Sequence, residues 1–226
     1  MNKADTSFST VVIAIDGPAA SGKSTVARAL AARLGYRFLN SGDLYRAITW
    51  NCLSQDVDCR DIGAVASAVG NSHVEIGCDG TDYYPIVDGT DSRAYLREQV
   101  VNANVSPVSA VPAVRYILSA AIRVHAQGRQ TVVEGRDIGS AVFPETPYKF
   151  YIDAPAQVRQ RRRRDQGQTE EIAKRDFIDS TRSTDPLTIA PGATVIDTST
   201  LDVEGVVAAM VEKLRAQGLV FDRTRR

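Results

Sequence analysis

The sequence lacks an excess of either charge, and it lacks long hydrophobic runs. Its 226 residues carry 27 basic and 27 acidic side chains, a formal net charge of +0, so no overall field would draw the chain onto nucleic acid or an anionic membrane. No run of about 18 consecutive apolar residues is present, as a membrane-spanning helix requires, and the polar first ten residues have no signal-peptide pattern. We therefore expect a cytoplasmic protein with no membrane partner and no nucleic-acid partner.

Cysteine is also scarce. Cys52, Cys59 and Cys78 are odd in number and no two of them have the CxxC spacing, so the sequence indicates neither a disulfide framework nor a zinc site. The composition is otherwise that of a globular protein, with 43% hydrophobic and 24% charged residues. A chain of this length fits one core with a small inserted lobe.

Apolar strands alternate with amphipathic helices along most of the chain. Residues 11–16 read Val-Val-Ile-Ala-Ile-Asp, a run typical of a strand buried on both faces. An apolar stripe with helical spacing begins at Lys23, and Gly35 is a natural helix stop. The expected strands are residues 11–16, 36–39, 131–134, 149–152 and 194–196. The expected helices are residues 23–34, 44–53, 112–126, 155–165, 169–180 and 203–215. This order predicts an α/β fold with a parallel sheet covered on both faces, in which ligands bind at the carboxyl ends of the strands.

Residues 61–105 interrupt this alternation. Polar and apolar residues alternate from His73 onwards, residues 78–82 are of the types found in turns, and residues 83–87 have the pattern of a returning antiparallel strand. The segment therefore predicts a hairpin-containing insert in the core.

A phosphate-binding loop follows the first strand. Residues 17–24, Gly-Pro-Ala-Ala-Ser-Gly-Lys-Ser, satisfy GxxxxGK[ST] between a strand and a helix. In such a P-loop the main-chain N–H groups cradle phosphates, Lys23 reaches the outer phosphates and the Ser24 hydroxyl can ligate magnesium. The loop alone does not separate a kinase from a GTPase or a motor ATPase. The guanine-reading pattern Asn-Lys-x-Asp occurs only at residues 2–5, before the first strand, which argues against a GTPase.

Arginine recurs beside short polar residues at the expected ligand edge of the sheet. The four segments are residues 41–46, 134–137, 159–164 and 175–182. Guanidinium groups hold phosphates bidentately and neutralise the charge that develops during phosphoryl transfer. The run of residues 161–164 also has a nucleic-acid interpretation, but no aromatic residues are interleaved with it. A lid that covers phosphates is the better account.

Five motifs together resemble those of the bacterial cytidylate kinases, a family of nucleoside monophosphate kinases. The resemblance extends from about Val11 to Leu214. Its motifs are the P-loop, the segments 41–46, 106–115 and 134–139, and the segment 175–182 with Pro186 and Leu187 after it. The chain departs from the family pattern at Asn40, where the family has aspartate, and at Asp43, where it has a small residue. The stretch between residues 163 and 175 is also shorter than the family's lid.

The resemblance implies a three-layer P-loop kinase fold with a five-stranded parallel sheet, a small mixed α/β nucleotide-binding insert and a short lid. The core would comprise residues 11–60 and 106–217, and the insert residues 61–105. The lid would comprise residues 159–174, and residues 1–10 and 218–226 would be flexible termini.

The resemblance also implies roles for residues of the acceptor site. Phosphate contacts are expected from Ser41, Arg46 and Arg136, a ribose contact from Asp137, and cytosine contacts from Ser106, Arg115 and Asp179. Arg175 and Arg182 would bridge towards the transferred group. A carboxylate, an arginine and a hydroxyl suit the edge of cytosine, whose amino group donates while its carbonyl and ring nitrogen accept.

On the donor side, ATP would contact the P-loop and two arginines of the lid. The expected contacts are Gly17, Pro18, Ala19, Ala20, Ser21, Gly22, Lys23, Ser24, Thr25, Arg159 and Arg163. Magnesium would be ligated by Ser24, with Asp16 and Glu134 either ordering its waters or orienting the loop and Arg136. The catalytic groups would be Lys23, Arg136, Arg175 and Arg182.

The expected activity is therefore transfer of the γ-phosphoryl group of ATP to CMP or dCMP by a monomeric enzyme. Two alternatives remain at this point. One is another small-molecule P-loop kinase, with UMP or AMP as acceptor. The other is a P-loop NTPase switch.

Overall fold

The computed structural model describes residues 9–165 and 172–221. The flexible termini expected at residues 1–10 and 218–226 fall largely outside this range. Residues 166–171 of the expected lid also lie outside the described residues.

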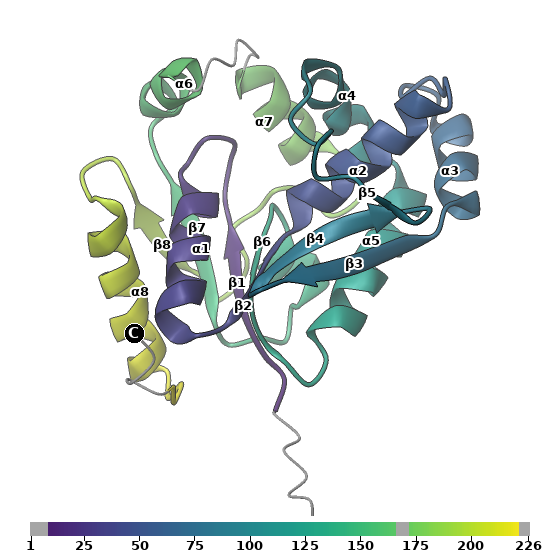
Figure 1. The fold of residues 1–226 in the computed structure, drawn as a ribbon. Coiled ribbons are helices and arrows are strands. Elements are labelled where there is room, and N and C mark those ends of the chain that lie inside the picture. Colours follow the sequence, from purple (N-terminus) through teal and green to yellow (C-terminus); the bar gives the residue numbers. More distant parts are fainter. Residues whose placement is uncertain (1–8, 166–171, 222–226) are drawn as a thin grey trace, which may run out of the picture.

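The five parallel strands that the sequence predicted lie side by side in an eight-stranded sheet, from its middle to the edge formed by β8 (Thr194–Asp197; Figure 1). In spatial order they are β2 (Arg37–Asn40), β6 (Gln130–Glu134), β1 (Val11–Asp16), β7 (Lys149–Asp153) and β8. All four neighbouring pairs are parallel. The carboxyl ends of these strands therefore meet at one edge of the sheet.

Helices cover both faces of this sheet, which makes three layers (Figure 1). Helices α1 (Lys23–Leu34) and α8 (Val203–Ala216) pack on one face, and α2 (Ser41–Ser54) and α5 (Pro112–Ala126) on the other. Strand β1 shows why both faces are buried. Ile13 and Ile15 belong to the cluster under α1 and α8, whereas Val12 and Ala14 belong to the opposite cluster, because successive side chains of a strand point to opposite faces.

The insert contains the expected hairpin and two helices that the sequence analysis did not identify. The hairpin pairs β3 (Val74–Asp79) with β4 (Asp82–Val87), and a short β5 (Thr90–Asp91) pairs with β4. The additional helices are α3 (Ile62–Asn71) and α4 (Gln99–Ala110). Strand β4 also pairs in parallel with β2 at Phe38 and Asp82, so the insert continues the central sheet. Helix α4 crosses residue 105, the expected end of the insert.

The remaining elements lie near the carboxyl ends of the strands. A single π-helical turn, η1 (Ile138–Val142), follows β6, and helices α6 (Ala156–Asp165) and α7 (Ile172–Thr181) stand over that edge of the sheet (Figure 1). In the described part of the chain, no helix by itself has the length and hydrophobicity to cross a bilayer. Helices α4 and α5, bent by 94°, meet those criteria only as a pair.

Candidate active site

The loop between β1 and α1 has the backbone geometry of a phosphate cradle. Gly22 precedes α1 with φ 88°, and Ala20 has φ 58° although it is not a glycine. Gly17 has φ 152°, and a Cβ atom there would lie 2.0 Å from the carbonyl oxygen of Ile152. Only glycine fits at this close approach of the loop to β7. The curled main chain places the loop at the N-terminus of α1, where N–H groups and the helix dipole favour anions.

Lys23 is buried at the start of α1. Its ammonium group donates a hydrogen bond to the carbonyl oxygen of Pro18 at 3.1 Å. Burial and the positive charge of Arg136 together lower the pKa of Lys23 to about 7, although the negative charge of Glu134 acts in the opposite direction. A bound anion would compensate this cost, because it restores an opposite charge to a desolvated ammonium group.

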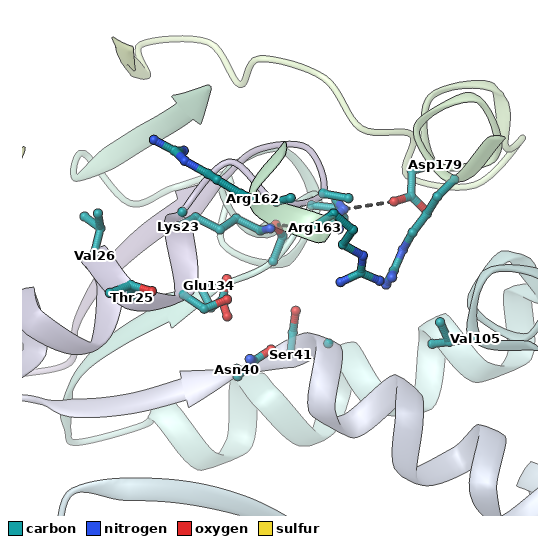
Figure 2. Close-up of a pocket in the computed structure, with 18 of the residues that line it drawn as sticks. Lys23, Thr25, Val26, Asn40, Ser41, Val105, Glu134, Arg162, Arg163 and Asp179 are labelled. Carbon is teal, nitrogen blue, oxygen red and sulfur yellow. Dashed lines mark hydrogen bonds and ion pairs between the residues drawn. The ribbon is translucent and has the colours of Figure 1, made fainter. Parts of the chain in front are cut away.

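A cavity of about 650 Å³ lies between the loop and the arginine-bearing segments, a size that suits nucleotide ligands. In Figure 2, Lys23, Glu134, Ser41 and Asp179 point into this shared space. Most of the residues singled out by sequence line it. They are Ala19, Ala20, Gly22, Lys23, Ser24, Thr25, Ser41, Arg46, Ser106, Glu134, Arg136, Asp137, Arg163, Arg175, Asp179 and Arg182.

The wall opposite the P-loop is strongly cationic. Arg46 donates to the side-chain oxygen of Asn102 at 3.2 Å and to the carbonyl oxygen of Gly42 at 2.9 Å. Burial, together with the positive charges of Arg175 and Arg97, lowers the pKa of Arg46 to about 9. Cations that repel one another in a desolvated site are suited to a ligand with several negative charges.

Two carboxylates form ion pairs with other arginines at this edge of the sheet. Asp179 accepts a hydrogen bond from Arg136 Nε at 2.9 Å. Burial alone would raise the pKa of Asp179, but Arg136 and Arg175 outweigh burial and hold it below its ordinary value. Asp137 is contacted by Arg182 Nη2 at 3.2 Å and by Arg115 Nη2. These pairs fix the direction of each guanidinium group.

Several predicted contacts lie outside the cavity lining. They are Asp16, Gly17, Pro18, Ser21, Arg115 and Arg159. Arg115 is 1% exposed and donates to Asp185 at 3.0 Å and to the carbonyl oxygen of Ser109 at 3.2 Å, besides its contact with Asp137. Arg159 donates to the carbonyl oxygens of Ala19 at 3.1 Å and Ala154 at 2.9 Å. Direct contacts of either arginine with a nucleotide therefore stay predictions.

Asp16 contacts the main chain of the segment after β6. Its two carboxylate oxygens accept hydrogen bonds from the N–H groups of Ile138 and Gly139, each at 2.7 Å. Burial raises the pKa of Asp16 to about 7. These contacts tie the end of β1 to the segment that follows Arg136.

The donor set suits magnesium rather than a metal held by the protein alone. The described residues contain no group of three or more His, Cys, Asp or Glu side chains that could hold a metal ion. Ser24 and Glu134 both line the cavity beside the P-loop. One hydroxyl and one carboxylate fit a magnesium ion that takes most of its ligands from water and substrate phosphates.

Several residues of the site were not predicted from the sequence. Arg97 and Asn102 line the cavity from the insert, and Thr198 lines it next to the P-loop, beside Arg162 of the run that the sequence assigned to a lid. Thr198 directly follows β8, so its place at a strand end was a usable signal. Arg97 forms an ion pair with Asp43 at 2.7 Å. No local pattern could reveal a pair so far apart along the chain.

Two comparisons of the sequence with known proteins, one with a family model and one with relatives, agree on one family. A family model described as "Cytidylate kinase" matches residues 13–216. The chain is 40% identical over 217 residues to "Cytidylate kinase" of Caldanaerobacter subterraneus subsp. tengcongensis, which covers 91% of this chain and 95% of the relative. It is 41% identical over 218 residues to "Cytidylate kinase" of Streptomyces avermitilis, with 91% and 94% covered. The solved structure of shikimate kinase from Acinetobacter baumannii matches with a TM-score of 0.45 and 17% identity, over 93% and 96% of the two chains. From its match to the family model and its identity to these relatives, this chain belongs to the cytidylate kinase family.

Proposed function

We propose that this protein is a cytidylate kinase that transfers the γ-phosphoryl group of ATP to CMP or dCMP, giving ADP and CDP or dCDP. The relatives at 40–41% identity carry the name of this activity over most of their length. The observation that carries the proposal is a single cavity with a P-loop on one wall and arginines on the other. Such a cavity holds two anionic substrates phosphate to phosphate.

The P-loop wall is assigned to ATP. Main-chain N–H groups of the loop and the N-terminus of α1 would hold its β- and γ-phosphates, with Lys23 as the partner of the outer oxygens. Ser24, with Glu134 acting through water, would hold a magnesium ion, which supplies neutralisation of phosphate charge during transfer.

The opposite wall is assigned to the monophosphate. Arg46, Arg136 and Ser41 would contact its phosphate oxygens, and this assignment is supported by their presence in the cavity lining. Asp179 and Ser106 line the same wall and suit the edge of cytosine, because a carboxylate kept ionised accepts a hydrogen bond from the cytosine amino group. Uracil has a carbonyl in that position, so UMP would leave Asp179 facing another acceptor.

The reaction needs positioning and charge neutralisation more than proton transfer. An oxygen of the CMP phosphate attacks the γ-phosphorus of ATP, the bond from that phosphorus to the bridging oxygen breaks, and ADP leaves with the electron pair. The attacking oxygen is already anionic, so no strong general base is required. Arg136, Arg175 and Arg182 would stabilise the charge that spreads over the transferred group.

An acceptor panel tests the proposal. ADP formation is measured with ATP and magnesium in the presence of CMP, dCMP, UMP, AMP or no acceptor. We expect the highest kcat/KM with CMP or dCMP. A higher kcat/KM with UMP or AMP would assign the enzyme to the alternative kinase class. Slow ATP hydrolysis that no acceptor stimulates would instead identify an NTPase switch.

A further inference from the structure

Two charged residues outside the cavity lining form hydrogen bonds with the main chain of the P-loop. The N–H group of Ala19 donates to Asp176 Oδ1 at 3.2 Å, and the carbonyl oxygen of Ala19 accepts from Arg159 Nη1 at 3.1 Å. Arg159 and Asp176 also form an ion pair with each other. The three residues thus close a ring of hydrogen bonds that ties α6 and α7 to the loop.

The two charged members of this ring lie outside the cavity lining. Ala19 and Ala20 line the cavity, whereas Asp176 and Arg159 do not belong to its described lining. Both charged side chains are largely buried, with exposures of 22% for Asp176 and 11% for Arg159. An ion pair that also satisfies the N–H and C=O groups of Ala19 favours one conformation of the loop, because any other conformation breaks both of these hydrogen bonds.

The loop has a reason to need such support at this place. Ala20, the residue after the gripped one, has φ 58°, a left-handed conformation that costs alanine about 1 kcal/mol more than glycine. A constraint on Ala19 therefore opposes relaxation of Ala20 to a negative φ.

A second set of hydrogen bonds holds the loop two residues further along the chain, at Ser21. Arg162 donates to the carbonyl oxygen of Ser21 at 3.2 Å and to that of Thr198 at 2.7 Å. The hydroxyl of Thr198 donates to the same Ser21 oxygen at 2.9 Å. Helix α6 thus donates hydrogen bonds to two carbonyl oxygens of the loop, those of Ala19 and Ser21. Of these two positions, only Ala19 is also bonded to α7, the helix that carries Arg175 and Asp179.

We propose that Asp176 is a positioning residue, which with Arg159 holds Ala19 so that the P-loop keeps its phosphate-binding conformation. The inference rests on the proposed function in taking a nucleoside triphosphate as the ligand of the loop. Asp176 acts on the donor through the loop and makes no contact with the acceptor. Loss of its carboxylate therefore weakens ATP binding and leaves CMP binding nearly unchanged.

Direct binding and kinetics of the full chain test this proposal together. Dissociation constants for Mg-ATP and for CMP are measured separately by calorimetry, and KM values for both come from the ADP-release assay. We expect Asp176→Ala to weaken ATP binding about tenfold, the factor that corresponds to about 1.4 kcal/mol. Its CMP dissociation constant should change less than twofold. Ser180→Ala, at an exposed position of the same helix, is the matched control and should change neither.

A second substitution separates positioning from a general loss of structure. Ala20→Gly removes the strain of the left-handed residue, so ATP binding by the double variant Asp176→Ala/Ala20→Gly should recover several-fold from that of Asp176→Ala. A defect confined to the packing of α7 would show no such recovery. Equal ATP affinity of Asp176→Ala and the parent, or a parallel loss of CMP affinity, overturns the proposal. If the parent binds ATP but fails to phosphorylate CMP, the proposed function is wrong while the binding comparison still decides the role of Asp176.

Discussion

At the scale of single residues, the site depends on charges that are buried and compensated by one another. Lys23, Arg46 and Arg136 are held close enough that burial and mutual repulsion lower the pKa of the first two. Asp179 and Asp137 offset part of this repulsion through their arginine pairs. Anionic substrates supply the missing negative charge, so binding and transition-state stabilisation use the same groups.

Substitution of Lys23 should affect turnover more than acceptor binding. Lys23→Ala removes the ammonium group next to the P-loop, and loss of one donor aimed at developing charge typically costs about 10²–10³-fold in kcat. CMP binding should fall far less, because Arg46 and Arg136 remain on the opposite wall. The coupled assay gives kcat and calorimetry gives the CMP dissociation constant. Lys213→Ala, at an exposed position of α8, is the control, and an unchanged kcat in Lys23→Ala would remove the P-loop from the mechanism.

Substitution of Asp179 should change which base is preferred. Asp179→Asn replaces one acceptor oxygen with an amide donor, which can pair with the carbonyl of uracil. We expect the ratio of kcat/KM for CMP over UMP to fall about tenfold or more. Both values should also decrease, since Asp179 orients Arg136, so the ratio is the informative quantity. A parental ratio in this variant would show that another residue reads the base.

The buried thiol of Cys52 predicts a change in stability at alkaline pH. Cys52 is 1% exposed, and burial raises its pKa to about 11. The unfolded chain releases this proton first, so the free energy of unfolding falls as pH rises from about 9 towards 11, by about 3 kcal/mol in total. Urea unfolding at several pH values should therefore show a shallower decline in Cys52→Ala than in the parent. Cys78→Ala, which alters an exposed thiol, should keep the parental slope.

At the scale of elements, the unit formed by β1, the P-loop and α1 is held by a close contact with β7. Gly17 lies where a Cβ atom would meet the carbonyl oxygen of Ile152 at 2.0 Å. That oxygen belongs to the main chain of a buried strand, so moving it to make room for a Cβ atom would disturb the packing of the sheet. The position of the loop relative to the sheet therefore depends on one glycine.

A pair of glycine substitutions separates this contact from backbone strain. Gly80, in the β3–β4 turn, has φ 60° and no atom within 4 Å of a Cβ built there, so Gly80→Ala should cost only about 1 kcal/mol of stability. Gly17→Ala adds a steric overlap and should cost several times as much, with loss of activity. Thermal unfolding and the kinase assay measure both. An equal loss of stability in the two variants would show that β7 shifts to accommodate the added methyl group.

The helices of the insert show where local sequence patterns failed. Helix α4 contains Pro107 and several valines and asparagines, residue types with low helix propensity. Its buried Val105 and Val108 pack into the core cluster that also contains residues of α2 and α5, so tertiary contacts outweigh propensity. Helix α3 did carry a local signal, because Asp61 caps it by accepting from the N–H group of Ala64 at 3.0 Å.

At the scale of the whole molecule, one continuous cavity joins the two substrate walls. The P-loop belongs to the core, Arg97 and Asn102 belong to the segment that leads out of the insert, and Asp179 belongs to α7. Because β4 pairs with β2, the insert is fixed to the same sheet as the P-loop. A ligand that reaches both walls therefore contacts the core, the insert and α7 at once.

A bisubstrate ligand should exploit this continuity. Adenosine and cytidine joined through five phosphates should bind at least about 10²-fold more tightly than ADP or CMP alone, because the second contact becomes intramolecular. The uridine counterpart is the matched ligand, and it should bind more weakly if Asp179 reads cytosine. Calorimetry measures each affinity. An affinity no better than that of ADP would mean that the two walls do not accept nucleotides simultaneously.

Local sequence determined the order of elements and the donor wall. The five parallel strands, the P-loop and the insert hairpin follow from patterns within a few residues, where apolar alternation, glycines and helix starts act directly on the backbone. The arginine-bearing segments could be recognised for the same reason. Most of their residues do line the cavity.

Tertiary structure alone decided how the charged side chains pair. Arg115 meets Asp137 and Asp185, Arg159 meets Asp176, and neither arginine lines the cavity. These partners lie 17 to 70 residues apart. Only the packing of α5, α6 and α7 around the sheet brings them together. Ion pairs are set by distance and burial in space, and a pattern along the chain carries neither.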